Sequence, residues 1–273
     1  MTMSEEHKEP VPVVVVAPIP EPKKKVGVGK VIAAIGVVLG IIVAVINIVQ
    51  YVSGKPTLLD LFRAKPTNAH VYEVGETVHF GQWDWRVLAV ENDKALLITK
   101  DVVELLPYHE KRTTVTWENC TLRAYLNGSF YNSFGEEDQA RIALTHNENP
   151  NNTWGHTQGK PYNTQGGNPT NDHIFLLSVP EVLKYFPGLE RTDDIYYGLD
   201  LSNENFLENY EKIRGIYKGS PFGWWLRSPG SPDTTYCSIA AVFGFLVSVQ
   251  GAPATGEGLD EIGVRPALWL KLT

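Results

Sequence analysis

The chain has 273 residues, of which 43% are hydrophobic and 20% charged, and its formal net charge is −7. Residues 1–70 hold eight Lys/Arg and five Asp/Glu, so residues 71–273 hold 16 against 26, a net charge of −10. Because phosphate backbones are bound by clustered cations, this balance excludes nucleic acid as a partner of the C-terminal part. About 200 residues suffice for one full core and are too few for two comfortable domains.

The N-terminus predicts a tail followed by a membrane anchor. Residues 1–30 contain five prolines among Val, Glu and Lys, a composition that favours extended, solvated chain. Residues 31–52 carry no charge and would span about 33 Å as a helix, against a hydrocarbon core of about 30 Å. A cleaved signal peptide is the alternative, but its apolar stretch is shorter and ends in a small-residue site that this sequence lacks. We therefore expect a transmembrane helix.

Flanking charges predict the orientation of that helix. The four lysines next to its start are Lys23, Lys24, Lys25 and Lys30, whereas Lys55 alone stands close behind it. The lysine-rich side of a span stays in the cytoplasm. We expect a single-pass protein of the cell membrane with a cytoplasmic N-terminus, a juxtamembrane linker over residues 53–70 and an extracytoplasmic globular domain over residues 71–273.

The first half of the globular part predicts strands and then helices. Apolar residues alternate or cluster over residues 77–80, 85–90 and 95–99, with turn residues between them. Thr116 is the expected N-cap of a helix over residues 116–126 that Asn127-Gly128 would end. Ser133 and Glu136 have the spacing of a capping box for the next helix.

The second half of the sequence returns to strands. A long polar loop over residues 146–170 leads to a predicted strand at 174–177 and a capping box at Ser178 and Glu181, whose helix Pro187-Gly188 ends. A further helix is expected near residues 203–213, and strands from residue 223 to the C-terminus. Strands at both ends with helices between them predict an α+β domain whose first and last strands share one sheet.

Several long motifs occur in a fixed order. They are Phe80-Gly81 leading to Trp85-Arg-Val-Leu, Trp117-Glu-x-Cys-x-Leu-Arg-x-Tyr-Leu-Asn, Phe175-Leu-Leu-Ser, Trp224-Trp-Leu-Arg-Ser-Pro-Gly and Val264-Arg-Pro-Ala-Leu-Trp. In this order they resemble a bacterial family, domain of unknown function 6273, over residues 74–270. Members of that family occur behind a single membrane span. The last third is also similar, more loosely, to C-type-lectin-like folds of the formylglycine-generating kind, in which the stretch between Arg227 and Arg265 would face a ligand.

The candidate ligand-binding residues lie in the same last third. Trp225 and Arg227 could form part of an aromatic platform, although alternation along a strand places one of the two tryptophans in the core. The alternative for Arg227 and Arg265 is a structural role in hydrogen-bonding loop carbonyls. Residues 231–261 add three aromatic side chains among small and turn-forming residues, a mixture that suits recognition. These three are Tyr236, Phe243 and Phe245.

The sequence lacks recognisable catalytic and cofactor signatures. There is no Gly-rich phosphate cradle, no G-x-S-x-G and no paired-carboxylate motif. His146 and His156 flank Glu148 with a spacing that fits no helix-borne metal pair, so we expect neither a metal nor a cofactor. Cys120 and Cys237 could be joined by a disulfide, but burial as two free thiols is the alternative that we favour.

These features predict a surface-displayed, non-catalytic binding module whose ligand is a glycan, a peptide or an envelope protein. Two alternatives remain. One is a structural or regulatory envelope protein that contacts its partners through the membrane helix or the Pro-rich tail. The other is an unrecognised hydrolase that uses the polar loop, which would require a deep pocket lined by His146, Glu148 or His156.

Overall fold

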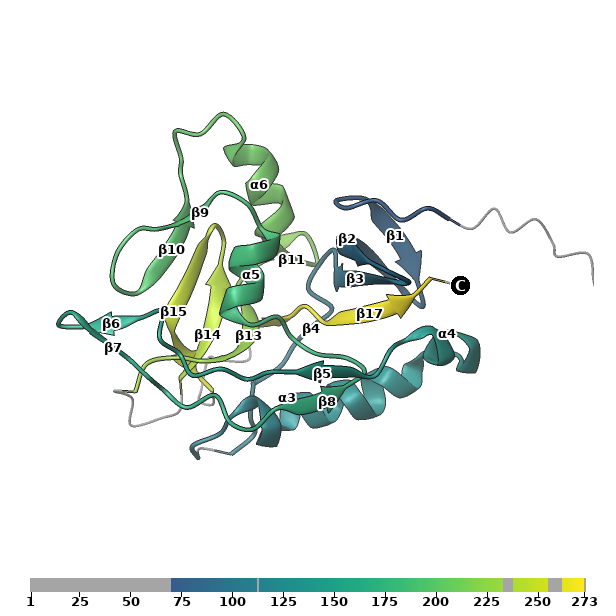
Figure 1. The fold of residues 1–273 in the computed structure, drawn as a ribbon, viewed down its shortest axis with the longest axis horizontal. Coiled ribbons are helices and arrows are strands. Elements are labelled where there is room, and N and C mark those ends of the chain that lie inside the picture. Colours follow the sequence, from purple (N-terminus) through teal and green to yellow (C-terminus); the bar gives the residue numbers. More distant parts are fainter. Residues whose placement is uncertain (1–69, 112, 233–237, 255–261, 273) are drawn as a thin grey trace, which may run out of the picture. The chain divides into compact units, whose positions relative to one another are not determined.

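A computed structural model describes residues 70–111, 113–232, 238–254 and 262–272 (Figure 1). The predicted tail, the predicted membrane helix and the linker up to residue 69 lie outside the described residues. Within the described ranges, no helix is both long and apolar enough to cross a membrane. A compact unit begins at His70 and runs to Thr273, and it contains all the elements below.

The first sheet joins the two ends of this unit. Its order is β1-β2-β3-β17, and its strands are antiparallel: β1 (Thr77–Phe80), β2 (Trp83–Glu91), β3 (Lys94–Thr99) and β17 (Ala267–Lys271). The alternating burial of β1 matches its alternating sequence, whereas β3 is buried along nearly its whole length because it is central. The prediction that the first and last strands share a sheet is confirmed (Figure 1).

The second sheet has the order β4-β16-β13-β14-β15-β10-β9. Its strands are β4 (Glu104–Leu105), β16 (Gly263–Val264), β13 (Trp224–Pro229), β14 (Ser238–Phe243), β15 (Leu246–Pro253), β10 (Tyr196–Leu199) and β9 (Leu189–Arg191). The described pairings are antiparallel apart from the parallel pair β13–β16. The strands predicted from residue 223 onward are therefore present.

The helical segment after β4 is longer than predicted. Asn127-Gly128 does not end it, because the chain continues without a break as a π-helix and then a 3-10 turn. Thr116 is the N-cap residue of the first 3-10 turn, as predicted, but its side chain makes no cap bond. Cys120 caps the α-helix that follows: its Sγ accepts a hydrogen bond from the Arg123 N–H at 3.3 Å. The elements are η1 (Trp117–Asn119), α3 (Thr121–Tyr125), η2 (Leu126–Phe130) and η3 (Tyr131–Ser133).

Two of the capping predictions can be compared directly. α4 (Glu136–Arg141) has Gly135 as its N-cap, and the Ser133 hydroxyl donates to the carbonyl of Phe130 at 2.6 Å instead. The first predicted capping box is therefore wrong. α5 (Val179–Tyr185) begins with the predicted box, in which the Ser178 and Glu181 side chains each bond the other's backbone N–H. α6 (Phe206–Ile213) begins three residues later than expected.

The polar loop over residues 146–170 contains a small hairpin, and its two ends are paired as strands. β5 (Thr145–Asn147) pairs with β8 (Thr170–Asp172), and β6 (His156–Thr157) pairs with β7 (Lys160–Pro161) between them. A separate hairpin later in the chain pairs β11 (Gly215–Tyr217) with β12 (Ser220–Phe222). The predicted strand at 174–177 is reduced to one bridge between Phe175 and Ala267. Helices and many strands together make the domain α+β, as predicted.

Candidate functional site

Both tryptophans of the Trp-Trp-Leu-Arg motif belong to the core. Trp224 and Trp225 are each 0% exposed. Their indole N–H groups are satisfied internally, by the carbonyl of Ile213 at 3.0 Å and by that of Leu106 at 2.9 Å. Trp225 therefore does not form a surface platform in this structure, because β13 is covered on both faces and the alternation argument assumed one open face.

Arg227 is likewise a buried structural group. Its side chain is 4% exposed and pairs with Glu181, with 3.0 Å between Nη2 and Oε1. It also donates to the carbonyl of Leu176 at 2.7 Å. Burial alone would raise the pKa of Glu181, but Arg227 and the donors of Ser178 outweigh it and hold that pKa below its ordinary value. The motif thus fixes the start of α5 to β13.

Arg265 has the same kind of role at the junction of the two sheets. It is 0% exposed and donates to the carbonyls of Thr99, Lys100, Ile213 and Arg214 at distances between 2.9 and 3.3 Å. Its guanidinium lies 4.9 Å from the ring centroid of Trp224. Burial, with help from the neighbouring cation Arg86, lowers the pKa of Arg265 to about 9. The expected hydrogen bonding to loop carbonyls is what the structure has.

A third buried cluster uses the motif around Cys120, and we call the clusters around Arg227, Arg265 and Asp172 the buried locks. The carboxylate of Asp172, which is 0% exposed, accepts from the Trp117 indole at 2.9 Å and from Arg123 Nε at 2.6 Å. Asn147 and Thr170 donate to the same carboxylate at 3.0 and 2.7 Å. The Trp-x-x-Cys-x-x-Arg spacing therefore connects α3 to the β5–β8 ribbon.

Cys120 itself is a free, buried thiol. Burial raises its pKa to about 12, so the thiol stays protonated at neutral pH. Its sequence-predicted alternative partner, Cys237, lies outside the described residues.

The late aromatic segment is only partly described. Tyr236 lies outside the described residues, whereas Phe243 is 39% exposed at the β14–β15 turn. Phe245 is half-buried, and its ring packs edge-on against Phe206 with 5.9 Å between centroids. A ligand-binding role for these three residues stays a prediction.

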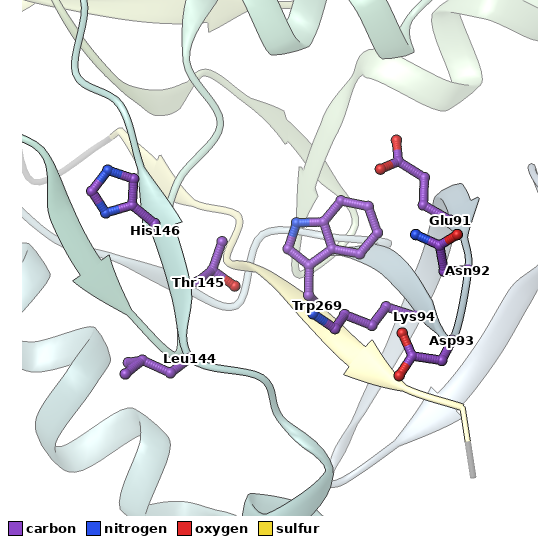
Figure 2. A pocket seen from close by; sticks show the side chains of 8 residues that line it. All are labelled: Glu91, Asn92, Asp93, Lys94, Leu144, Thr145, His146 and Trp269. Carbon is purple, nitrogen blue, oxygen red and sulfur yellow. The ribbon is translucent and has the colours of Figure 1, made fainter.

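An open pocket lies elsewhere, where the β2–β3 turn faces the start of β5. We call it the Trp269 pocket, and its volume is about 230 Å³. Its lining residues are Glu91, Asn92, Asp93, Lys94, Leu144, Thr145, His146 and Trp269. Figure 2 shows the Trp269 indole standing between the turn residues on one side and the residues of the β5 segment on the other.

Local structure explains how each wall of the Trp269 pocket is placed. Trp269 sits opposite Leu96 in the β17–β3 pairing, which fixes its half-buried ring at the edge of the first sheet. Asn92 has φ 53°, a left-handed conformation that asparagine tolerates in tight turns. His146 is oriented by two contacts, from Nδ1 to Asn171 Oδ1 at 3.0 Å and from Nε2 to Glu148 Oε1 at 3.3 Å.

The lining of the Trp269 pocket combines an aromatic ring with many hydrogen-bonding groups. Carboxylates accept, an amide both donates and accepts, an ammonium donates and a hydroxyl does either. Leu144, which is 61% exposed, adds an apolar rim. Such a mixture can hold a ligand that has one apolar face and a polar edge.

The groups proposed for hydrolysis do not form a deep site. The side chains of His146 and Glu148 are 59% and 74% exposed, so water competes for both. His156 lies on β6, where its ring contacts Arg191, and it does not line the Trp269 pocket. Over the described ranges, no group of three or more His, Cys, Asp or Glu residues is placed to hold a metal ion.

Sequence reasoning singled out His146 and the motif that ends in Trp269, but it did not predict that these residues line one pocket. Trp269 occurs in a segment that reads as an ordinary closing strand, and residues 91–94 read as an ordinary turn. The β2–β3 turn is visible in the sequence, but its approach to residues 144–146 is not, because no local pattern encodes it.

The fold and the pocket define an α+β domain with an open aromatic pocket, and four of its five sequence motifs lie within the match to one family. The family model described as domain of unknown function (DUF6273) matches residues 92–272, and the chain belongs to that family. The match begins in the β2–β3 turn, so β1 and β2, which carry the Phe80-Gly81 and Trp85-Arg-Val-Leu motif, lie outside it although both strands belong to the first sheet. No curated protein and no solved structure matches the chain.

Proposed function

We propose that this protein is a membrane-anchored, extracytoplasmic module that binds a glycan through the Trp269 pocket and does not transform it. The observation that carries the proposal is the half-buried indole of Trp269, bordered by carboxylate, amide, ammonium and hydroxyl groups in one open cavity.

Sugar rings match this lining in two ways. One face of a pyranose carries C–H groups, which pack on an aromatic ring, and its edge carries hydroxyls that both donate and accept hydrogen bonds. Asn92, Asp93 and Thr145 offer complementary partners around the ring. A strongly anionic ligand fits less well, because Glu91 and Asp93 stand in the lining against a single lysine, Lys94.

The size of the Trp269 pocket limits what it holds. At about 230 Å³, it is smaller than the roughly 300–1,000 Å³ of pockets for drug-sized ligands. We infer that it receives one sugar ring of a longer chain. Binding of that kind is weak for a single ring, which suits a receptor for a repetitive polymer at a surface.

The rest of the proposal concerns placement and fold. The uncharged stretch over residues 31–52 would serve as a single-pass anchor, with its lysine-rich flank in the cytoplasm. The order of a Trp-Leu-Arg strand, an intervening stretch and a closing segment that contains Val-Arg-Pro supports a C-type-lectin-like domain behind the anchor. Protease added outside intact cells should then digest the C-terminal domain, and digestion only after lysis would contradict this placement.

Binding should be tested with the full-length chain in a detergent that has no sugar headgroup. The probes are cellohexaose, maltohexaose and chitohexaose, titrated by calorimetry. We expect at least one of them to bind and Trp269→Leu to weaken that binding by tenfold or more, equivalent to about 1.4 kcal/mol.

Two further variants separate recognition from folding. His146→Ala removes an exposed lining group and should weaken binding without changing thermal stability. His70→Ala, at an exposed histidine that does not line the Trp269 pocket, is the matched control and should leave binding unchanged. Absence of binding by all three probes, or binding that Trp269→Leu and His146→Ala leave unchanged, would refute the proposal.

A further inference from the structure

A second open cavity lies at the other end of the first sheet. We call it the Trp83 pocket, and its volume is about 360 Å³. Its lining residues are His79, Gln82, Trp83, Asp84, Thr99, Lys100, Asp101, Val102 and Val103. It is formed by the β1–β2 turn together with the segment that follows β3.

The two pockets share the same chemistry although they share no residue. Each has one half-buried tryptophan, one histidine, one side-chain amide, one threonine, one lysine and two carboxylates. In each, the amide residue comes from a hairpin turn of the sheet: Asn92 from the β2–β3 turn and Gln82 from the β1–β2 turn. A lining that suits a sugar ring in the first pocket therefore suits one in the second.

The Trp83 pocket is held rigidly by contacts beneath it. The ring of Trp83 stacks on Phe130 with 4.5 Å between centroids and is tilted against Phe134 at 5.1 Å, so these two rings hold the indole in place. The Lys100 N–H donates to the carbonyl of Asp84 at 2.8 Å and so joins the two walls. The buried Arg265 guanidinium donates to the carbonyls of Thr99 and Lys100 in the same wall. A wall fixed in this way loses little freedom when a ligand binds.

The two pockets lie at opposite ends of one strand. β3 begins at Lys94, in the Trp269 pocket, and ends at Thr99, in the Trp83 pocket. Five steps of about 3.4 Å separate these residues, so the pockets are about 17 Å apart along the strand.

The two tryptophans also lie on opposite faces of the sheet. Trp269 is opposite Leu96, so its side chain shares the face of Leu96. Trp85 is opposite Thr99, three residues further along β3, and so lies on the other face. Trp83 is two residues before Trp85 and contacts it edge-on at 6.5 Å, which places Trp83 on the face of Trp85.

We propose that the Trp83 pocket is a second glycan-binding site and that one domain therefore joins two glycan chains. This inference rests on the proposed function of the Trp269 pocket. A short oligosaccharide cannot reach both tryptophans, because they lie on opposite faces as well as at opposite ends of the sheet. Bivalence of this kind multiplies weak contacts on a repetitive polymer and cross-links separate strands of it.

The test is the stoichiometry of binding to the full-length chain, with cellohexaose, maltohexaose and chitohexaose as probes. Wild-type protein should bind two molecules of an accepted hexasaccharide. Trp83→Leu and Trp269→Leu should each reduce this number to one, and the double variant should bind none. Because Trp83 supports Phe130, Gln82→Ala tests the same pocket from an exposed side chain, and it should weaken one of the two sites by several-fold.

The possible failures are distinguishable. A wild-type stoichiometry of one that only the Trp269-pocket variants alter would overturn the second site and leave the proposed function intact. Two sites of which neither responds to Trp83→Leu or Gln82→Ala would overturn it as well. If none of the probes binds, or if only the Trp83-pocket variants matter, the proposed function of the Trp269 pocket fails and bivalence fails with it.

Discussion

The buried locks and the open pockets of this domain use similar residues for opposite purposes. Around Asp172, Arg227 and Arg265, charged groups are enclosed and bonded to several partners each. In the Trp269 and Trp83 pockets, charged and amide side chains surround an indole that the fold leaves half-buried. The comparison teaches that most of the conspicuous sequence motifs build the scaffold, whereas each pocket that we propose for binding combines one tryptophan with residues from turns and strand ends.

Loss of the Arg265 side chain should have the largest effect on stability. Arg265→Leu leaves four buried or partly buried carbonyls short of donors, so we expect the free energy of unfolding to fall by about 3–5 kcal/mol. Chemical denaturation measures this. Arg265→Lys should recover only part of the loss, because an ammonium cannot reach the carbonyls as a planar fork does. A loss below about 1 kcal/mol would contradict the role of this lock.

Asp172→Asn should have the next largest effect. The substitution keeps the size of the side chain but leaves Arg123 without its carboxylate, and the amide nitrogen faces groups that donate. We expect a loss of about 2–3 kcal/mol in denaturation experiments. Asp84→Asn is the matched control, because Asp84 is mostly exposed and should change stability by less than about 0.5 kcal/mol. Equal effects of the two variants would contradict the difference between lock and pocket.

The pair of Glu181 and Arg227 should make stability depend on acid pH. Because the pKa of Glu181 lies below its ordinary value of 4.5, its ionised form stabilises the fold above about pH 4.5, and that contribution is lost as the pH falls through the lower folded value. Glu181→Gln should cost about 2 kcal/mol at neutral pH. The difference in unfolding free energy between wild type and variant should narrow below about pH 4.5. A difference that stays constant down to about pH 2 would contradict the stabilising role of ionised Glu181.

Asn92→Gly should have the smallest effect on the fold and a clear effect on binding. Glycine accepts the left-handed conformation at this turn, so the substitution removes the amide without straining the backbone. We expect hexasaccharide affinity at the Trp269 pocket to fall about fivefold, with stability changed by less than about 0.5 kcal/mol. Gln158→Gly is the matched control, at an exposed turn position with the same conformation. If both variants changed the affinity equally, the Asn92 amide would not be a ligand-binding group of the Trp269 pocket.

Much of the fold could be predicted, because its strands carry local signals. The alternation over residues 77–80 and the capping box at Ser178 are signals in which the residues that carry the pattern are the ones that form the element. The helix after β4 could not be bounded, because Asn127 reads as a stop but its side chain instead accepts from the N–H groups of His173 and Ile174. A local rule was overridden by a contact 46 residues away.

The pockets could not be predicted for the same reason. The Trp269 pocket joins three segments that are brought together by the pairing of β3 with β17 and by the bridge between Ile142 and Leu270. The sequence identifies Trp269 as a strand residue but does not say which tryptophan remains open. Trp225, which the sequence favours as a platform, is covered because β13 is buried on both faces.

The most direct test uses the seven tryptophans of the chain as reporters in nuclear magnetic resonance. Four indole N–H groups, those of Trp85, Trp117, Trp224 and Trp225, are hydrogen-bonded inside the domain. On addition of the hexasaccharide probes, the indole signal of Trp269 should shift while these four stay in place. A Trp269 signal that does not move with any of the three probes, or shifts confined to the four internal indoles, would contradict the assignment of a glycan site to this pocket.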